Sequence, residues 1–417
     1  MKTPEIRVTP GRVFVVALAA RAWHWALNPV SMPFVGDALE YDAFSRSLVE
    51  SGRYLGPNGE VASRMPGYPL FLAGVRLVSG GSLDATLALQ CVLGALTCVF
   101  LIDLARRFLP EKWALVCGVI AALYYDLIMP AAAPLSEALF SFFLVLSAWA
   151  LYRPSWKPMR RALVFGALSG CLYLIRPEPL PYIVCTIFLL PYIWAKFSRR
   201  EVFSALAVFA LVVGLWVGRN YAQFGRIIPA STVGKSVGYL SMYLPAAKMG
   251  LAGERHAPPA TMTELERDAD YAAAWRRLAA TLTWPQIAKG YVYNLLSILY
   301  PFLPEYDWTY VFIVPFWLFG CVIAARRREL WPVAGAVLFS LSVFTFFGGY
   351  ASRYRQGVSP FIVLLAVVGM KAARDARAGA RFSRWTGGWL GANLFIWLFQ
   401  AQARQLALWL RAVSWGH

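Results

Sequence analysis

Charged residues are scarce in this chain. Only 15% of its 417 residues are Asp, Glu, Lys or Arg, whereas 59% are hydrophobic. A soluble chain is about half apolar and about a quarter charged, so a single water-soluble core cannot bury this much apolar surface. The composition excludes a soluble enzyme, a disordered chain and a fibrous protein. It predicts that lipid surrounds most of the chain.

Acidic residues are fewer than basic ones. The chain has 22 Asp and Glu against 40 Lys and Arg, which gives a formal net charge of +18. In a soluble protein this excess would suggest a nucleic-acid partner, but no nucleic-acid-binding motif accompanies it. In a membrane protein the excess follows from the positive-inside rule and from anionic headgroups. We therefore expect membrane lipids, and no nucleic acid, among the partners.

The six cysteines do not indicate a disulfide framework or a metal site. All of them lie inside apolar runs, where Cys acts as a small buried hydrophobe. We also find no internal repeat and no low-complexity segment. The sequence therefore predicts one integral membrane domain over residues 1–417, without an appended soluble domain.

Long apolar runs predict an all-α polytopic membrane protein with about eleven transmembrane helices. Each run approaches the roughly 20 residues that cross a hydrocarbon layer of about 30 Å. No small-residue cleavage site follows the first run, which we interpret as a retained helix. The predicted spans are residues 12–30, 83–105, 113–130, 135–152, 161–176, 179–195, 202–219, 308–325, 330–348, 357–371 and 387–410.

The distribution of basic residues predicts the orientation of these spans. With the N-terminus in the cytoplasm, the cytoplasmic tail and short connections hold 21 of the 40 Lys and Arg, in agreement with the positive-inside rule. Sixteen of the 22 acids then lie on or near the outer face. Chemistry that needs carboxylates is therefore expected outside, on the periplasmic side of what we interpret as a bacterial inner membrane.

Two outer segments are long. Residues 31–82 contain short amphipathic stretches at 42–50 and 68–78, which predict helices lying in the membrane interface. Residues 220–307 contain a polar stretch at 263–280 that is laced with Arg, Asp and Glu and predicts another helix. The second segment is either a lid or a solvated connector.

Two carboxylates occupy positions where chemistry could take place. Asp37 follows the first span directly, and Glu137 opens the fourth span among mostly apolar neighbours. An acid at the end of a span avoids the penalty of about 2.5–3.5 kcal/mol that the bilayer centre imposes. Asp37 could also belong to a water-exposed loop, and Glu137 could simply stabilise a helix start through the helix dipole.

Five basic residues are predicted at the same outer face, against the positive-inside preference. A single interfacial arginine usually snorkels, but five together indicate an anionic ligand. Phosphate is the natural ligand, because Arg can bind it bidentately and Lys adds a point charge. The five residues are Arg176, Arg219, Lys235, Arg353 and Arg355.

An ordered set of short motifs resembles the GT-C membrane glycosyltransferases. The resemblance is closest to their bacterial branch, which is related to the protein mannosyltransferases and the lipid A aminoarabinose transferase, and it covers about residues 30–370. The motifs are Asp37-x-x-x-Tyr41, Pro66-Gly67-Tyr68-Pro69-Leu70, Leu135-Ser136-Glu137-Ala138-Leu139, Ile175-Arg176-Pro177-Glu178, Arg219-Asn220-Tyr221 with Phe224-Gly225 and Pro229-Ala230-Ser231-Thr232, and Ser352-Arg353-Tyr354-Arg355 with Pro360.

The resemblance implies a GT-C-like helical bundle that transfers a sugar from a polyprenyl-phosphate donor at the outer face. The family's first-loop acid matches Asp37, and its second-loop acid matches Glu137. Many relatives have two adjacent acids in the first loop and Asp in the second, whereas this chain has Ala38 after Asp37 and Glu at 137. These departures leave the use of Mg²⁺ or Mn²⁺, with Asp37 and Glu137 as tentative ligands, open.

The mechanism that we predict assigns a role to each candidate residue. Asp37 is the general base, with a pKa raised at the water–lipid boundary, and Glu137 is a metal ligand or orients Asp37. Arg353 and Arg355 hold the donor phosphate, with Arg176, Arg219 and Lys235 as further candidates. Tyr41 and Tyr354 donate hydrogen bonds to sugar or phosphate, or belong to the aromatic belt.

The acceptor and the general class of activity stay open at the level of sequence. A glycolipid, a glycan or a protein hydroxyl could accept the sugar at an outer face. A transporter or flippase for a lipid-linked or anionic solute would also use outer arginines and acids, although such proteins usually show repeated halves. A ligase that uses a lipid-diphosphate donor and no carboxylate base is the other alternative.

Overall fold

The described part of the chain is helical throughout. The computed structural model describes residues 8–30, 34–259, 261–299, 307–348, 352–375 and 379–399, and no β-strand occurs in these ranges. The helices of the first half are α1 (Pro10–Leu27), α2 (Asp37–Ser51), α3 (Gly67–Ser79), α4 (Leu83–Ala105), α5 (Glu111–Leu123), α6 (Tyr125–Ile128), η1 (Met129–Ala132), α7 (Glu137–Leu151), α8 (Pro158–Ile175) and α9 (Leu180–Ile193). Those of the second half are α10 (Arg199–Phe224), α11 (Gly234–Lys248), α12 (Glu264–Thr281), α13 (Trp284–Leu299), α14 (Trp308–Ala325), η2 (Arg328–Leu330), α15 (Trp331–Phe347), η3 (Ser352–Val358), α16 (Ser359–Asp375) and α17 (Gly379–Leu398).

A helix lies within each predicted span, but fewer helices meet a strict test for crossing a membrane. Among the described residues, five are long and apolar enough by length and composition: α4, α10, α14, η2 with α15, and η3 with α16. The predicted span 113–130 is not one straight helix. It breaks at Tyr124, whose backbone is extended, and the two parts differ in direction by 71°. The last predicted span, 387–410, extends beyond the described residues.

Several helix ends follow directly from local sequence. Pro10 opens α1, where a missing N–H costs nothing, and the Thr9 side chain caps it by accepting from the Arg12 N–H. A full capping box opens α12, in which Thr263 and Glu266 satisfy each other's backbone N–H groups. The helix α10 ends at Gly225, which adopts a left-handed conformation (φ 62°).

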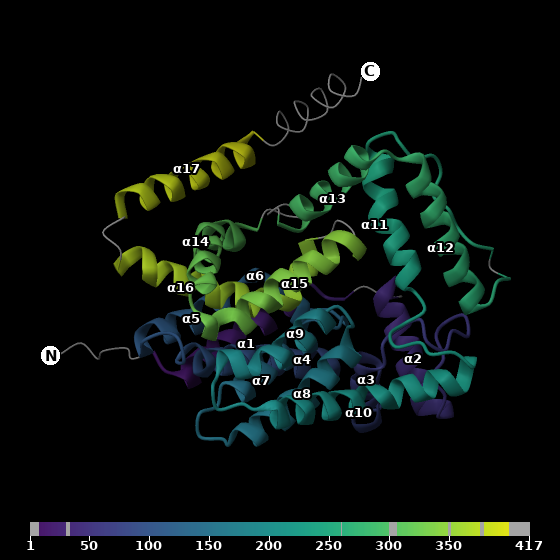
Figure 1. The fold of residues 1–417 in the computed structure, drawn as a ribbon, viewed down its shortest axis with the longest axis horizontal. Coiled ribbons are helices and arrows are strands. Elements are labelled where there is room, and N and C mark those ends of the chain that lie inside the picture. Colours follow the sequence, from purple (N-terminus) through teal and green to yellow (C-terminus); the bar gives the residue numbers. More distant parts are fainter. Residues whose placement is uncertain are drawn as a thin grey trace.

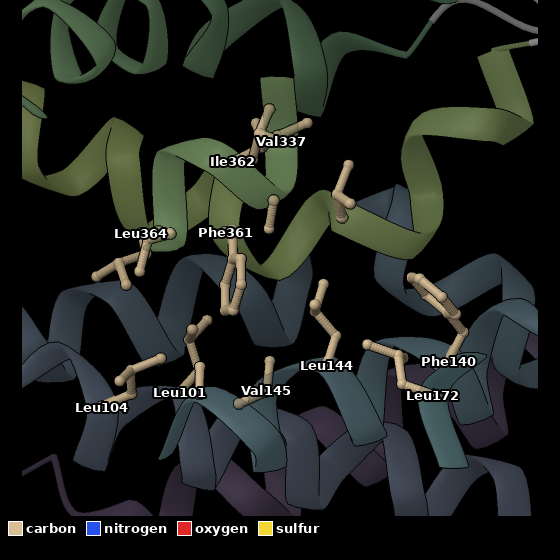
Figure 2. Close-up of a cluster of buried hydrophobic side chains, with 14 of the residues drawn as sticks. Leu101, Leu104, Phe140, Leu144, Val145, Leu172, Val337, Phe361, Ile362 and Leu364 are labelled. Carbon is tan, nitrogen blue, oxygen red and sulfur yellow. The ribbon is translucent and has the colours of Figure 1, made fainter. Parts of the chain in front are cut away.

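The centre of the bundle is an apolar core around α16. Seven consecutive side chains of α16, from Phe361 to Val367, are fully buried. Figure 2 shows α16 side chains such as Phe361 facing Leu101 of α4 and Val145 of α7. A helix that is buried on all sides lies in the middle of its bundle, so α16 joins the two halves of the chain.

Small residues bring two helix pairs into backbone contact. A Cβ added to Gly320 of α14 would lie 2.0 Å from the Leu365 carbonyl oxygen of α16, and one added to Gly369 would lie 2.1 Å from the Phe316 carbonyl oxygen. On the α8–α10 contact, a Cβ at Gly166 would lie 2.4 Å from the Ala205 carbonyl oxygen. Close approach at small residues is how helices associate in lipid, where the hydrophobic effect does not drive them together.

The helices of the two predicted outer segments gather at one end of the molecule. The predicted helices 42–50 and 68–78 correspond to α2 and α3, and the predicted helix 263–280 corresponds to α12. Figure 1 shows α2, α3, α11 and α12 at the right-hand end, opposite α5 at the left. We refer to α11, α12 and α13 as the cap. This end of the bundle carries the candidate site.

Candidate functional site

The first carboxylate of the site stands at the start of α2. Gly36 precedes it with a positive φ of 59°, and Asp37 is the first residue of the helix. One Asp37 oxygen accepts a hydrogen bond from Arg64 Nη2 at 2.7 Å, and the other accepts from Arg353 Nη2. The same Arg64 also binds Glu40, one turn further along α2, through Nε at 2.8 Å and Nη2 at 2.9 Å.

The second carboxylate, Glu137, is buried at the start of α7. Its side chain is 1% exposed. Its Oε1 atom accepts a hydrogen bond from Arg353 Nε at 2.7 Å and lies 3.0 Å from Arg176 Nη1. Its Oε2 atom is buried and has no hydrogen-bond partner among the described residues. An unsatisfied buried carboxylate oxygen is costly, and such atoms are typical of sites that hold a ligand or water.

Arg353 joins the two acids. Its Nε donates to Glu137 and its Nη2 donates to Asp37, so one guanidinium bridges carboxylates from the first outer loop and from α7. Arg176 extends the arrangement, because it also pairs with Glu178 at 2.7 Å. We refer to Asp37, Glu137, Arg64, Arg176 and Arg353 as the bridged cluster. The convergence of Asp37 and Glu137 on which the predicted chemistry depends is present in the structure.

The two predicted tyrosines, Tyr41 and Tyr354, lie beside the bridged cluster. Tyr41 is buried, with its hydroxyl 3.5 Å from the Ser136 hydroxyl and its ring below the Arg64 guanidinium, 5.6 Å away. Tyr354 stacks on Phe344 at a ring-centroid distance of 4.4 Å. Arg176 lies over the same Phe344 ring. Both tyrosines therefore contact residues that position the cluster.

The electrostatics at Asp37 differ from the sequence-based expectation. Burial favours the neutral acid, but the positive charges of Arg64 and Arg353 outweigh it, so the pKa of Asp37 is lowered from its ordinary value. We predicted a raised pKa from the boundary position alone. Two nearby guanidiniums could not be counted from the sequence, and they reverse the direction. Burial has the opposite result at Glu178, whose pKa is raised despite its pairing with Arg176.

Arg355 lies apart from the bridged cluster, in a buried ionic group of its own. Its side chain is 2% exposed and donates to Asp126 of α6 through Nε at 2.6 Å. It also lies 3.2 Å from an oxygen of Asp307, and its guanidinium covers the Tyr310 ring at 3.8 Å. Arg355 therefore ties η3 to α6 and α14, and it holds in place the short helix that carries Arg353.

Arg219 and Lys235 are likewise not brought into the bridged cluster. Arg219 Nη1 donates to the Val61 carbonyl oxygen at 2.5 Å, and the guanidinium lies over the rings of Tyr54 and Trp216. It thereby fastens α10 to the first outer loop. Lys235 is exposed near the start of α11, and its backbone N–H donates to Asp268.

Sequence analysis missed Arg64. It is a basic residue in a predicted outer loop, which is the same signal that singled out the other five arginines and lysines. Arg64 belongs to none of the motifs, and Met65 separates it from the motif that begins at Pro66. Its two acidic partners lie 24 and 27 positions away, and only folding of the loop brings them together.

The bridged cluster as arranged does not fit a divalent cation. The Arg353 guanidinium stands between Asp37 and Glu137, where such an ion would need carboxylate oxygens around it. Within the described ranges, no group of three or more His, Cys, Asp or Glu could hold a metal ion. The positive charge beside both acids comes from arginine.

Comparison with known proteins places the fold, but not the sequence. No protein-family model matches the chain, and no curated protein sequence matches it. The fold matches solved structures of oligosaccharyltransferases from Archaeoglobus fulgidus, one of which is named AglB. The apo form gives a TM-score of 0.53 at 14% identity, over 94% of this chain and 55% of the archaeal one.

Two further structures of these oligosaccharyltransferases match in the same way. The complex with an inhibitory peptide and a dolichol-phosphate gives a TM-score of 0.51 at 13% identity, over 93% of this chain and 54% of that one. The complex with zinc and sulfate gives a TM-score of 0.51 at 14% identity, over 93% of this chain and 51% of the archaeal one. The chain spans about half the length of these proteins. Its fold is therefore an all-helical membrane fold of the GT-C type, as the motifs predicted.

Proposed function

We propose that this chain is a membrane glycosyltransferase that moves a sugar from a polyprenyl-phosphate donor to an acceptor hydroxyl. The observation that supports this most directly is the bridged cluster, in which two carboxylates from distant segments share the Arg353 guanidinium. Transfer of a sugar from a polyprenyl phosphate needs two elements: a base that deprotonates the acceptor hydroxyl, and positive charge that stabilises the leaving phosphate. The GT-C-type fold is consistent with this chemistry.

The donor phosphate exchanges partners with Asp37 in this proposal. Without donor, Arg353 and Arg176 both form ion pairs with carboxylates. Phosphate oxygens form the same charge-assisted hydrogen bonds with a guanidinium and can replace a carboxylate. When phosphate takes the Nη2 donor of Arg353, Asp37 loses the hydrogen bond from one of the three arginines that lower its pKa. The carboxylate then becomes a stronger base in the complex that has bound donor.

The transfer step needs only these side chains and the two substrates. The acceptor oxygen bonds to the anomeric carbon while its proton passes to the Asp37 carboxylate. The bond between the anomeric carbon and the phosphate oxygen breaks, and the polyprenyl phosphate leaves with the electron pair. Arg353 and Arg176 stabilise the charge that develops on that phosphate. Glu137 orients Arg353, because it holds the Nε side of the same guanidinium.

The membrane setting of the proposal rests on charge and on the solved neighbours. The basic connections favour a cytoplasmic N-terminus and a site on the periplasmic side of a bacterial inner membrane. One AglB structure holds a dolichol-phosphate and an inhibitory peptide, which supports a lipid-phosphate donor here. A glycolipid, a glycan or a protein hydroxyl would be the acceptor.

Reconstitution separates the proposal from its two rivals. The purified chain in proteoliposomes receives a polyprenyl-monophosphate sugar in one sample and the diphosphate form in another, and products are identified by mass spectrometry. We expect a glycosidic product from the monophosphate donor. Movement of the lipid-linked sugar across the membrane without any product would favour a flippase. A product from the diphosphate donor alone would favour the ligase.

A further inference from the structure

A polar cavity of about 350 Å³ lies between the first outer loop and the cap. Its floor is formed by Leu39 and Glu40 of α2 and by Ser63, and its far wall by residues of α11 and α12 such as Ser236 and Asp268. Ligand sites in proteins run from about 300 to about 1,000 Å³, so this cavity has room for a small polar group. Nothing in the proposed transfer step uses it yet.

We propose that this cavity binds the sugar acceptor, and that the acceptor is a neutral or amine-bearing saccharide rather than an anionic one. The inference rests on the proposed transferase function and adds the chemical class of the second substrate. It would place the acceptor beside Glu40, one turn of α2 from Asp37.

The cavity adjoins the bridged cluster through one lining residue, Glu40. Glu40 lines the cavity and binds Arg64, and Arg64 also binds Asp37. Asp37 and Glu40 are three positions apart on α2, which places their side chains on neighbouring points of one helix face, about 5–6 Å apart at Cβ. A sugar held against Glu40 therefore lies about one helical turn from Asp37, with the Arg64 guanidinium bound to both carboxylates.

The lining suits a group with many hydroxyls. Asn58 and Ser63 from the connection between α2 and α3, and Ser236 from α11, offer hydrogen-bonding groups, and Tyr271 adds an aromatic ring. Hydroxyls and amides bind sugar hydroxyls in both directions, as donors and as acceptors. Tyr271 can cover the apolar face of a sugar ring.

The charges along the lining discriminate among saccharides. Glu40, Glu60, Glu264 and Asp268 contribute four carboxylates, of which Glu40 pairs with Arg64 and Glu60 with Arg267, so an excess of two negative charges is left. Like charges repel in a partly enclosed site, so a uronic acid or a phosphorylated sugar would be rejected. A neutral sugar enters without this cost, and an amino group gains from it.

The far wall of the cavity is held in place before any ligand binds. Glu264, the first residue of α12, accepts the Val61 N–H at 2.8 Å and the Ala62 N–H at 3.0 Å. The Thr232 N–H donates to the Ala62 carbonyl oxygen at 3.0 Å. The cap is therefore docked onto the first outer loop, and the cavity is preformed rather than induced.

Direct binding to the protein in nanodiscs tests the inference without any turnover. Saturation-transfer NMR would compare lactose, a glucosamine disaccharide and a disaccharide that contains glucuronic acid. We expect the glucosamine disaccharide to bind most strongly, lactose to bind more weakly, and the glucuronic-acid sugar to give no signal. Tighter binding of the acidic sugar, or no binding of any of the three, would overturn the inference.

Two variants and a control locate the binding. Ser236→Leu fills the cavity and should abolish the signals. Asp268→Asn should weaken binding of the glucosamine disaccharide by about tenfold, as expected for the loss of one charge-assisted hydrogen bond. Glu254→Gln removes a carboxylate from an exposed residue between α11 and α12 that does not line the cavity, and it should change nothing. Signals that survive Ser236→Leu place the sugar elsewhere.

Turnover distinguishes failure of this inference from failure of the proposed function. If saccharides bind in the cavity but no sugar is ever transferred, the transferase proposal fails and the binding site stands. If transfer occurs but Ser236→Leu leaves the acceptor KM unchanged, the transferase stands and this site fails. Unfolding temperatures of all variants identify any that lose binding merely because they are misfolded.

Discussion

The substitution Asp37→Asn is the sharpest perturbation of the proposed mechanism. It removes the proposed base while it keeps nearly the same shape, and the amide oxygen can still accept from Arg64. Both guanidiniums keep another carboxylate, because Arg353 binds Glu137 and Arg64 binds Glu40. The variant should therefore fold and still bind donor. Any loss of rate then reports on proton transfer and not on collapse of the site.

General-base catalysis contributes about 10²–10⁴-fold to rate, so we expect the turnover of Asp37→Asn to fall by that factor. The assay follows product formation from a polyprenyl-phosphate sugar by the purified protein in nanodiscs, with donor KM measured in parallel. Asp42→Asn is the matched control on the same helix, since Asp42 pairs with Arg46 and Arg76 and lies outside the bridged cluster. It should retain the wild-type rate.

The pH dependence adds an independent reading of the same carboxylate. Asp37 must be ionised to act as a base, so kcat/KM falls as the pH drops through its pKa in the free protein. Because that pKa is lowered, the fall should lie below the ordinary Asp value of about 3.9. Arg353→Ala removes one of the lowering cations and should move the fall to higher pH.

The reasoning is refuted by either of two results. Transfer by Asp37→Asn at an unchanged rate would show that another group accepts the proton. The second result is a fall of kcat/KM at low pH that does not move in Arg353→Ala, measured on the residual activity of that variant. It would show that ionisation of Asp37 does not cause the fall.

Three further predictions concern stability, metal and the cap. Arg355→Met leaves buried carboxylates without their cation and should lower the free energy of unfolding by about 3–5 kcal/mol, well beyond the effect of Arg353→Met at its more exposed site, and equal thermal unfolding of the two variants would contradict this. Exhaustive chelation should leave transfer intact, because Arg353 supplies the positive charge between the two acids, and activity restored only by Mg²⁺ or Mn²⁺ would show otherwise. Glu264→Gln should speed amide hydrogen exchange at Val61 and Ala62 by about tenfold or more, and unchanged protection would mean that Glu264 does not dock the cap.

The helical architecture could be predicted because it depends on local composition. Apolar runs of about 20 residues must form helices in lipid, since no other partner exists there for their backbone N–H and C=O groups. The helices of both long outer segments also followed from local periodicity and capping. The broken span at Tyr124 did not, because its turn is stabilised by Asp126 of α6, which meets Arg355 from a position 229 residues away.

The candidate site could be predicted only in part. The sequence by itself determined which acids stand at the ends of apolar runs, and so it pointed to Asp37 and Glu137. It could not separate Arg353 from Arg355, which are two positions apart in one 3₁₀ helix. With about three residues per turn, such neighbours point to different sides of the helix, and only the surrounding helices decide which side faces the carboxylates. The tertiary structure likewise decided the role of Arg64 and the direction of the Asp37 pKa, because electrostatic effects depend on distances between segments that the linear order does not contain.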